Sequence, residues 1–348
     1  MRLDTMFLAG VGVWLPQAVS VRSLVERGEY AANEAAARGM LSILIAEGRI
    51  APPEMAVCAA RDALARAAVP AGDIGLALHS SMYFQGIDMW PAASYIAHEA
   101  VGRGVPGYEI AQQANGGMAA LQMAALTLAA GEAAGDAAPA ALISTADRFS
   151  APRFDRWRTD GSAVYGDGAT AVVVSRRAGF ARLLSVVTRA DNSMEEIVRG
   201  SSFYPAPLAG RPLDLQPRKD DFSAATGMDF RELATRPARV IRAAMEGALA
   251  EAGVDLRSIS RVISPVADRR LIMPIMQILG IDENRTTWDW GRRTGSMGAG
   301  DQFAALHWLV RTGTARPGDR LLMVGAGAGF SSTAAVIEIL QTPSGDHP

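Results

Sequence analysis

The sequence predicts an α/β protein built from two similar halves, and three observations lead to this prediction. A chain of 348 residues with 49% hydrophobic residues can bury a large core. Short apolar strands alternate with alanine-rich helical stretches, the pattern of sheets that helices cover. An internal repeat relates the first part of the chain to the second. We therefore expect an N-terminal half at residues 1–178 and a C-terminal half at residues 179–348.

The repeat is visible in two separate places. Residues 63–80 (ALARAAVPAGDIGLALHS) align without a gap with residues 248–265 (ALAEAGVDLRSISRVISP), at an offset of 185 residues (248 − 63). The stretch Met118–Leu121 faces Phe303–Leu306 at the same offset. Alanine-rich helices match by chance fairly often, so the shared offset is the informative part. It indicates a gene duplication, with a helix, a turn and a strand in each copy.

The elements of the N-terminal half follow from local patterns. The apolar stretch before Pro16 predicts a first strand. A helix is expected to open at Pro52–Pro53, because proline is favoured in the first turn. That helix carries Cys58, the lone cysteine, which we expect to be a buried core thiol. The apolar run at 140–144 (AALIS) predicts a buried strand.

In the C-terminal half, the run at 320–324 (RLLMV) predicts the strand that corresponds to 140–144. Residues 190–235 are richer in Pro, Asp and Ser, so we expect an irregular surface insertion there, as a lid or a wall of a substrate channel. The GAGAG sequence at 325–329 leads into a strand-like run rather than a helix. It therefore does not fit a dinucleotide-binding loop.

Composition excludes several classes of function. The net charge is −2 and the pI is about 6.1, so no basic surface indicates binding of nucleic acid or anionic membrane. One cysteine excludes an internal disulfide, and four scattered histidines make no metal site. No signal peptide or long apolar segment is evident. We expect a cytoplasmic protein with no membrane contact.

Six motifs, in this order, resemble those of the ketoacyl-ACP synthase III family, within its acyltransferase branch of antibiotic and polyketide biosynthesis. They are SSMYFQGIDMWPAASYIAHE (80–99), EIAQQANGG (109–117), GDGA (166–169), SPVADRRL (264–271), GRRTGSMGAGDQ (291–302) and GAGAGFSSTAAVIEI (325–339). The resemblance covers essentially the whole chain. It implies a thiolase-like five-layer αβαβα sandwich, two halves related by a pseudo-twofold axis, and a homodimer.

The resemblance also shows that catalytic side chains are replaced. The family's nucleophile is a cysteine on the turn before a buried helix, where the helix N-terminus stabilises a thiolate. Ala114 occupies that position, and a methyl group cannot attack a thioester. Pro265 replaces the histidine of condensing members, and Ser296 aligns with the histidine of the acyltransferase branch. Of a Cys-His-Asp set, only Asp268 remains.

The binding machinery is expected to survive these replacements. The family's oxyanion hole uses two backbone amides, which match those of Ala114 and Ala328. The other residues that the resemblance places at the substrate are Trp90, Asn115, Phe330, Arg156 and Arg158. The two arginines would approach the phosphates of coenzyme A or phosphopantetheine, with a solvated charge cluster as the alternative. For Trp90 the alternative is a place in the core or in a dimer interface.

The leading hypothesis is an enzyme of secondary metabolism that handles acyl thioesters. It would transfer or cyclise an acyl group from acyl carrier protein or coenzyme A to a small-molecule or carrier acceptor, with Asp268 accepting a proton. No cofactor besides the thioester substrate is expected. Two alternatives stay open: a Cys-dependent acyltransferase carrying an engineered Cys→Ala change at 114, and a non-catalytic pseudo-ketosynthase that pairs with an active subunit.

Overall fold

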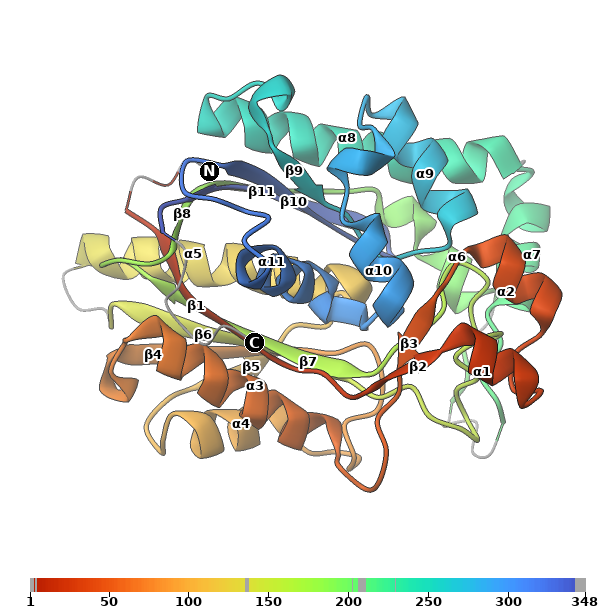
Figure 1. Cartoon of the computed structure of the whole chain (residues 1–348), viewed down its shortest axis with the longest axis horizontal. Helices are drawn as coiled ribbons and strands as arrows, with labels where there is room; N and C mark the ends of the chain where they lie inside the picture. The colour runs from red at the N-terminus through yellow and green to blue at the C-terminus, as the bar shows by residue number, and fades with distance from the viewer. Residues whose placement is uncertain are drawn as a thin grey trace.

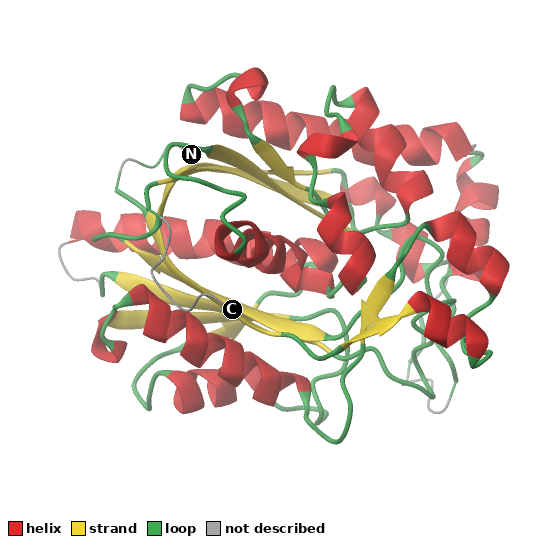
Figure 2. Cartoon of the chain, viewed as in Figure 1, coloured by secondary structure: helices red, strands yellow, loops and turns green. Residues whose placement is uncertain are grey.

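The computed structural model describes residue 3 and residues 5–134, 138–201, 203–205, 211–228 and 230–341. Its centre is a nine-stranded sheet with the order β5-β4-β6-β7-β1-β8-β11-β10-β9. The sheet bends back on itself, so that two helices lie between its halves and further helices cover each outer face (Figure 1). The result is a sandwich of five alternating helical and sheet layers, seen by colour in Figure 2.

The N-terminal half contributes one half of the sheet and the helices on it. Helices α3 and α4 pack on the outer face, and α5 lies in the central layer (Figure 1). The strands are β1 (Phe7–Trp14), β4 (Ile74–Ser80), β5 (Gly107–Glu109), β6 (Ala140–Asp147) and β7 (Gly168–Ser175). The helices are α3 (Pro52–Ala67), α4 (Ala92–Ala100) and α5 (Gly116–Ala134), with the short 3-10 turns η1 (Ala71–Asp73) and η2 (Gln113–Asn115).

The C-terminal half repeats this plan. Helix α8 packs on the outer face of β8 and β11, and α11 joins α5 in the central layer. The strands are β8 (Ala181–Ala190), β9 (Arg261–Ile263), β10 (Arg320–Gly327) and β11 (Ser331–Ile339). The helices are α8 (Phe230–Ala252), α9 (Arg269–Ile278), α10 (Trp288–Thr294) and α11 (Asp301–Arg311), with the 3-10 turns η4 (Leu256–Ser258), η5 (Glu283–Arg285) and η6 (Gly298–Gly300).

Two further groups of elements lie outside the repeated plan. The first is the ribbon of β2 (Ala18–Ser20) and β3 (Ser42–Leu44) with helices α1 (Val21–Glu26) and α2 (Ala32–Arg38). The second is the excursion of η3 (Asn192–Met194), α6 (Glu196–Arg199) and α7 (Gln216–Thr226). Both groups lie at the same end of the molecule, the right-hand side of Figure 1.

The two halves share strand order and pairing direction. From the middle outwards the order is β1-β7-β6-β4 in one half and β8-β11-β10-β9 in the other. In each half the first two pairings are antiparallel and the third is parallel. The 3-10 turns η1 and η4 and the turns η2 and η6 recur at the offset of 185 residues seen in the sequence (256 − 71 and 298 − 113). These correspondences are those that a duplication predicts.

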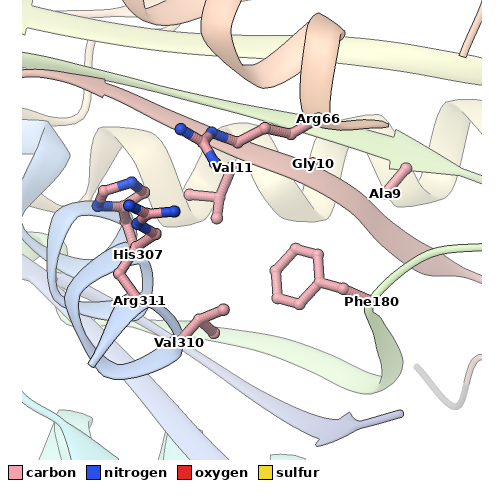
Figure 3. Close-up of a pocket in the computed structure, with 8 residues that line it drawn as sticks. All are labelled: Ala9, Gly10, Val11, Arg66, Phe180, His307, Val310 and Arg311. Atoms are coloured by element: carbon pink, nitrogen blue, oxygen red, sulfur yellow. The ribbon is translucent and has the colours of Figure 1, made fainter. Parts of the chain in front are cut away.

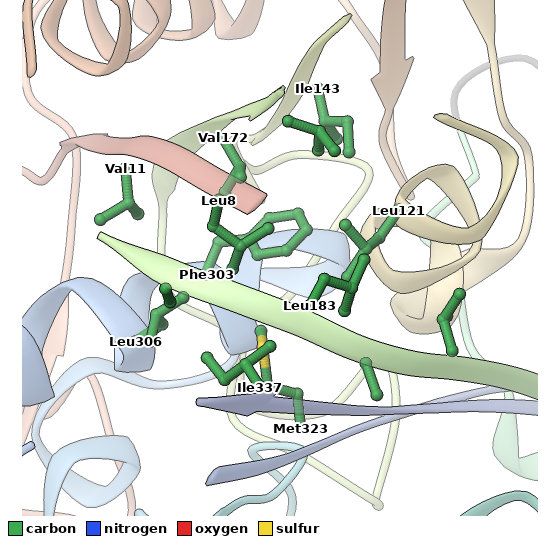
Figure 4. Close-up of a cluster of buried hydrophobic side chains, with 14 of the residues drawn as sticks. Leu8, Val11, Leu121, Ile143, Val172, Leu183, Phe303, Leu306, Met323 and Ile337 are labelled. Carbon is green, nitrogen blue, oxygen red and sulfur yellow. The ribbon is translucent and has the colours of Figure 1, made fainter. Parts of the chain in front are cut away.

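The central layer carries the main core. Leu121 of α5 and Phe303 and Leu306 of α11 are fully buried. They pack between strands of both halves, as Figure 4 shows with Leu8 and Ile337 nearby. Strands β6 and β7 are buried at every position, because helices cover both of their faces. This burial holds the N-termini of α5 and α11 at a fixed place relative to each other.

Two expectations from the sequence are wrong. Cys58 is exposed, because it lies on the outer stripe of α3 with Glu54 and Arg61, whereas Ala59 and Ala60 face the sheet. The segment 190–235 is not irregular throughout, since its described parts include α6 and α7. Helix α7 is held to the loop before β7 by an ion pair between Lys219 Nζ and Asp160 Oδ1 at 2.5 Å. Among the described residues, no helix is both long and apolar enough to cross a membrane.

Candidate active site

The turn that carries Ala114 lies directly before the buried helix α5. Residues Gln113–Asn115 form a 3-10 turn, and α5 begins at Gly116. Ala114 itself is half-buried. The free amides of the first turn of α5 give this end of the helix a partial positive charge. The structure therefore keeps the placement expected for a nucleophile, while the side chain at that place is a methyl group.

Asn115 anchors this turn to the opposite half of the sheet. Its Nδ2 donates hydrogen bonds to Ser331 Oγ and Thr333 Oγ1, both at 3.1 Å. Its Oδ1 accepts one from the backbone N–H of Thr333 at 3.0 Å. The side chain has no exposed surface and its donors are used within the protein. Asn115 thus holds the turn in place from behind, and has no free group for the substrate contact that the sequence suggested.

The glycine-rich end of β10 lies against the same turn. A Cβ on Gly327 would lie 2.5 Å from the carbonyl oxygen of Gln112 and 2.9 Å from the amide nitrogen of Asn115. Only a residue without a side chain allows the two chain segments to approach this closely. Ala328 is the residue directly after Gly327, in the turn that follows β10. The structure thus brings the Ala114 turn against the end of β10, next to Ala328, and the role of these two amides as an oxyanion hole stays a prediction.

Ser296 and Asp301 form a buried pair at the N-terminus of α11. Ser296 Oγ donates a hydrogen bond to Asp301 Oδ2 at 2.9 Å. The Asp301 carboxylate also accepts from the backbone N–H of Met297 at 2.7 Å and from that of Val266 at 3.2 Å. Burial raises the pKa of Asp301 to about 7, although these three hydrogen bonds lower it. We call these two hydrogen-bonded side chains the Ser296–Asp301 pair.

The turn after Ser296 connects this pair to the Ala114 turn. The turn η6 contacts η2, and a Cβ on Gly117 of α5 would lie 2.3 Å from the carbonyl oxygen of Ala299. Gly298 has φ +63° and faces Asp147, since a Cβ there would lie 2.6 Å from Asp147 Oδ2. Burial raises the pKa of Asp147 well above its usual range. Two buried carboxyl groups therefore flank η6.

Asp268 has the contacts of a helix cap. It precedes α9, and its Oδ1 accepts from the backbone N–H of Arg270 at 2.9 Å. The Arg270 guanidinium reaches Asp268 Oδ2 at 2.6 Å, and Arg38 lies 3.7 Å from the same oxygen. Two cations and a backbone donor thus engage this carboxylate. The geometry gives Asp268 a structural role, rather than the proton-accepting role predicted from the sequence.

The two arginines predicted near phosphate groups differ in environment. Arg156 is mostly buried, pairs with Asp167 at 3.2 Å and donates to the carbonyl oxygen of Tyr165. It therefore holds the chain before β7 and is not available to a phosphate. Arg158 is 67% exposed and its guanidinium lies 3.6 Å from Asp155. Only Arg158 has the exposure that a phosphate contact requires.

The two predicted aromatic contacts, Trp90 and Phe330, are half-buried. Trp90 packs against Tyr95 of α4, with ring centroids 5.5 Å apart. Phe330 lies in the turn after β10, where its backbone exchanges two hydrogen bonds with Asp191. Phe330 thus follows Ala328 at the site, whereas Trp90 lies beside the outer helix α4.

His79 at the end of β4 corresponds to Ser264 at the repeat offset (264 − 79 = 185). The ring is buried, with Nδ1 2.9 Å from Ser144 Oγ and Nε2 3.1 Å from Gln85 Oε1. Burial lowers its pKa. Both ring nitrogens are thus engaged in the interior.

A small cavity in the described part of the chain lies at the opposite end of α11 from Ser296. Figure 3 shows the guanidinium groups of Arg66 and Arg311 and the imidazole of His307 turned toward one another there. Its volume of about 10 Å³ holds roughly one water molecule. This cavity is therefore no part of a channel that leads to Ala114.

Asp301 and Asp147 are site residues that were not predicted from the sequence. Asp301 lies inside the quoted motif at 291–302, directly before an apolar helix. A signal was therefore present, since an acidic residue at a helix start followed by FAAL predicts a buried carboxyl group. Asp147 ends an apolar strand, and only the fold brings it beside Gly298.

Comparison with known proteins identifies the family of this chain. The family model described as 3-oxoacyl-[acyl-carrier-protein] synthase III matches residues 108–192, and the model of its C-terminal part matches residues 249–339. The β-ketoacyl-[acyl-carrier-protein] synthase III of Aquifex aeolicus is 25% identical over 338 residues, which are 95% of this chain and 98% of that protein. The mycobacterial synthase III of Mycobacterium tuberculosis is 28% identical over 291 residues, covering 82% of this chain and 80% of its own.

Solved structures agree. ChlB3, described as an acyltransferase, is 36% identical and superposes with a TM-score of 0.88 over 98% of this chain and 99% of its own. The priming β-ketosynthase of the R1128 polyketide pathway has the same fold, with a TM-score of 0.77, 24% identity and 99% coverage of both chains. The thiolase-like architecture is confirmed by these likenesses. The chain belongs to the 3-oxoacyl-[acyl-carrier-protein] synthase III family and is an enzyme of that type.

Proposed function

We propose that this protein transfers an acyl group directly from a carrier-protein or coenzyme A thioester to a second bound substrate, without an acyl-enzyme at position 114. The acceptor supplies a hydroxyl, an amine or a carrier thiol, or lies in the same molecule, in which case the product is a ring. The reaction needs no cofactor besides the thioester. The likeness to ChlB3 and to a polyketide priming enzyme supports a place in antibiotic or polyketide biosynthesis.

One observation carries the proposal. The Ala114 turn is fixed by Asn115 and by its contact with Gly327, and neither depends on the side chain at 114. The backbone amides of Ala114 and Ala328 therefore keep the position in which they can polarise a thioester carbonyl. Backbone donors tolerate replacement of the nucleophile, whereas covalent chemistry does not. In this proposal the protein still binds the thioester and polarises its carbonyl group, although the thiol nucleophile is absent.

Direct transfer needs the acceptor beside the polarised carbonyl. Holding two reactants in the reacting geometry supplies effective molarities of about 10⁵–10⁸ M in well-oriented systems. Such a site gives rate without covalent catalysis, provided that both substrates are bound together. For an acceptor that is a separate molecule, we therefore expect no half-reaction, meaning no release of free thiol when the thioester is supplied alone.

The test compares Ala114→Cys with the parent chain by intact-protein mass after incubation with an acyl-CoA. We expect no stable adduct on the parent, although it binds the thioester in calorimetry. Ala114→Cys should be acylated, because the N-terminus of α5 stabilises the new thiolate. All variants carry Cys58→Ser, since the exposed Cys58 thiol could exchange with the thioester.

Ala111→Cys is the matched control, because residue 111 is exposed and precedes the turn without lying at the helix N-terminus. It should stay unmodified under the same conditions. A covalent adduct on the parent chain, or equal acylation of both cysteine variants, would refute the proposal. An engineered origin of Ala114 predicts that Ala114→Cys also turns over rapidly, whereas a chain lacking the histidine should deacylate slowly.

A non-catalytic pseudo-ketosynthase is the second candidate, favoured by the replacement of both catalytic positions by Ala114 and Ser296. It predicts thioester binding with no transfer to any acceptor, and a mixed dimer with an active paralogue in native mass spectra. The direct-transfer proposal predicts product whenever both substrates are present.

We also propose a homodimer formed through the β5 edge of the sheet. Strand β5 is the last strand on that side and is only three residues long. Tyr108 on β5 is 57% exposed, and Met123 and Leu126 on α5 are 50% and 41% exposed. Helix α5 packs on β4, the neighbour of β5. An unpaired edge with apolar side chains near it favours association with a second copy.

A further inference from the structure

The Ser296–Asp301 pair joins the two segments in which the resemblance places the family's histidines. Asp301 accepts a hydrogen bond from Val266, next to Pro265, and from Ser296 and Met297. A single carboxylate thus ties the 264–268 segment to the 295–297 segment. Ser296 aligns with the histidine of the acyltransferase branch, and Asp301 lies where the two segments meet.

Asp301 forms no ion pair with another described residue, and its three hydrogen-bond donors are neutral. Asp147 on the β6 side and Tyr165 from the chain before β7 are the titratable groups that face it. Neither a carboxyl nor a phenol group can carry a positive charge, and the pKa of each is raised. Burial therefore dominates and brings the pKa of Asp301 to about 7.

A carboxyl group in this condition can exchange a proton at neutral pH, which neither an ordinary aspartate nor a serine does alone. Ser296 is the outer member, being 3% exposed against 1% for Asp301. Its hydroxyl donates to Asp301 and accepts a bond from the backbone N–H of Gly298 at 3.3 Å. A hydroxyl that donates one hydrogen bond to a carboxylate and can accept another from a second group is able to pass a proton toward that carboxylate.

We propose that Ser296 and Asp301 act as a proton relay that takes up the proton of the acyl acceptor. This inference rests on the direct transfer proposed above and names the group that serves it. The relay requires the Ser296 hydroxyl to contact the acceptor, which makes Ser296 its catalytic residue. Asp301 is a positioning and proton-storing residue that acts through Ser296.

The step is balanced in atoms and charge. The acceptor oxygen or nitrogen bonds to the thioester carbonyl carbon, and the carbon–sulfur bond breaks. The acceptor proton moves to Ser296 Oγ while the Ser296 proton moves to Asp301 Oδ2. The departing thiolate then takes a proton back along the same path, which restores the ionised carboxylate. The products are the acylated acceptor and the free thiol.

Asp268 is the competing group, and its contacts argue against it. Arg270 and Arg38 both lie against Asp268 Oδ2, and the backbone N–H of Arg270 occupies Oδ1. Donors within the protein therefore already occupy both oxygens of Asp268. Asp301 lacks such partners. The relay therefore predicts a transfer rate that rises with pH through about 7, as Asp301 ionises, and then levels.

The experiment measures acyl transfer by the full chain from an acyl-CoA to a hydroxyl acceptor, across the pH range around neutrality. Ser296→Ala should lower kcat by about 10²–10⁴-fold and abolish the rise near pH 7, with little change in KM for the thioester. Ser185→Ala is the matched control, since Ser185 is also fully buried and donates to the carbonyl oxygen of Ala248. It should keep the rate and the pH profile of the parent.

A second readout does not depend on activity. Carbon-13 NMR of labelled aspartate should show one carboxyl group titrating near pH 7, absent from Asp301→Asn. In Ser296→Ala its pKa should rise, because the lost hydrogen bond favours the charged form. A parent Asp301 that titrates in the ordinary acidic range would overturn the relay.

The outcomes separate the two proposals. Transfer by the parent with an undiminished rate in Ser296→Ala would overturn the relay and leave direct transfer standing. Thioester binding without transfer at any pH would overturn direct transfer, and the relay with it. Loss of both rate and pH dependence in Ser296→Ala, with Ser185→Ala unaffected, supports the relay.

Discussion

His307 shows how a single partly buried side chain makes stability depend on pH. It lies in the last turns of α11, and its pKa falls from 6.5 to about 4. Burial is the main cause, followed by the positive charge of Arg66 and Arg311, while Asp62 opposes the shift. The folded protein therefore holds this imidazole neutral under conditions in which an unfolded chain would protonate it.

We predict that acid weakens the fold through His307. Because the folded pKa lies below the unfolded one, the unfolded state binds more protons between pH 6.5 and 4, so stability falls as pH falls through that window. His307→Gln should lose less of its free energy of unfolding across the window, measured by urea denaturation. His98→Gln is the control, since His98 is largely exposed. Parallel curves for the parent and His307→Gln would contradict the prediction.

Sequence reasoning located positions better than it located side-chain roles. The turns that carry Ala114 and Ala328 could be predicted, because the motifs at 109–117 and 325–339 identify them in the sequence. Cys58 was expected in the core because its neighbours are apolar, yet helix periodicity turns it outward. Arg156 looked like a phosphate ligand, because its partner Asp167 is revealed only by the fold.

At the scale of elements, the turn η2 is held in place by the side chain of its last residue, Asn115. The Asn115 amide joins η2 to β11 through three hydrogen bonds, two of them to the hydroxyls of Ser331 and Thr333. Thr333 Oγ1 lies 2.8 Å from Thr188 Oγ1 on β8. The start of α5 is thus tied to the neighbouring strands of the other half.

We predict that Asn115→Ala lowers the free energy of unfolding by about 1–3 kcal/mol, because it leaves the buried Thr333 amide unpaired. It should also weaken thioester binding, since the Ala114 amide loses its fixed position. Urea denaturation and calorimetry measure the two effects. Asn192→Ala, at an exposed asparagine in η3, should change neither. Full thioester affinity in Asn115→Ala would show that the turn holds without its anchor.

The regular elements could be predicted where burial produces a plain pattern. The strand at 140–147 is buried at every position, and its sequence begins with the apolar run Ala140–Ile143. Helix α7 was missed because its sequence is polar. Phe222 supplies its buried contact, and Lys219 pairs with Asp160. Such a helix is stabilised by partners distant in the sequence, which no local pattern records.

At the scale of the whole molecule, the duplication was visible in the sequence because both copies kept their helix-turn spacing. Among the described residues, β1 and β8 pair at two positions, Phe7 with Arg182 and Leu8 with Ala181, where the sheet continues from one half to the other. The central helices α5 and α11 therefore join the halves more extensively than the strands do. The boundary at 178 stays a prediction.

The proposed dimer gives a prediction at this scale. Tyr108→Lys places a charge on the exposed edge strand β5, and we expect it to shift the protein from dimer to monomer in size-exclusion chromatography with light scattering. Phe203→Lys is the control, at an exposed aromatic residue far from β5 in the chain. A parent chain that is monomeric, or a Tyr108→Lys variant that stays dimeric, would exclude this edge as the interface.

The independence of the η2 turn from the side chain at 114 has a consequence in the genetic code. Alanine and cysteine codons differ at both of their first positions, so a single nucleotide change cannot interconvert them. Serine and glycine are the residues whose codons lie one nucleotide change from both. Either residue fits this half-buried turn, because the contacts that fix the turn are made by Asn115 and Gly327. A lineage can therefore cross between covalent and direct chemistry through folded intermediates, one of which carries a hydroxyl where the thiol had been.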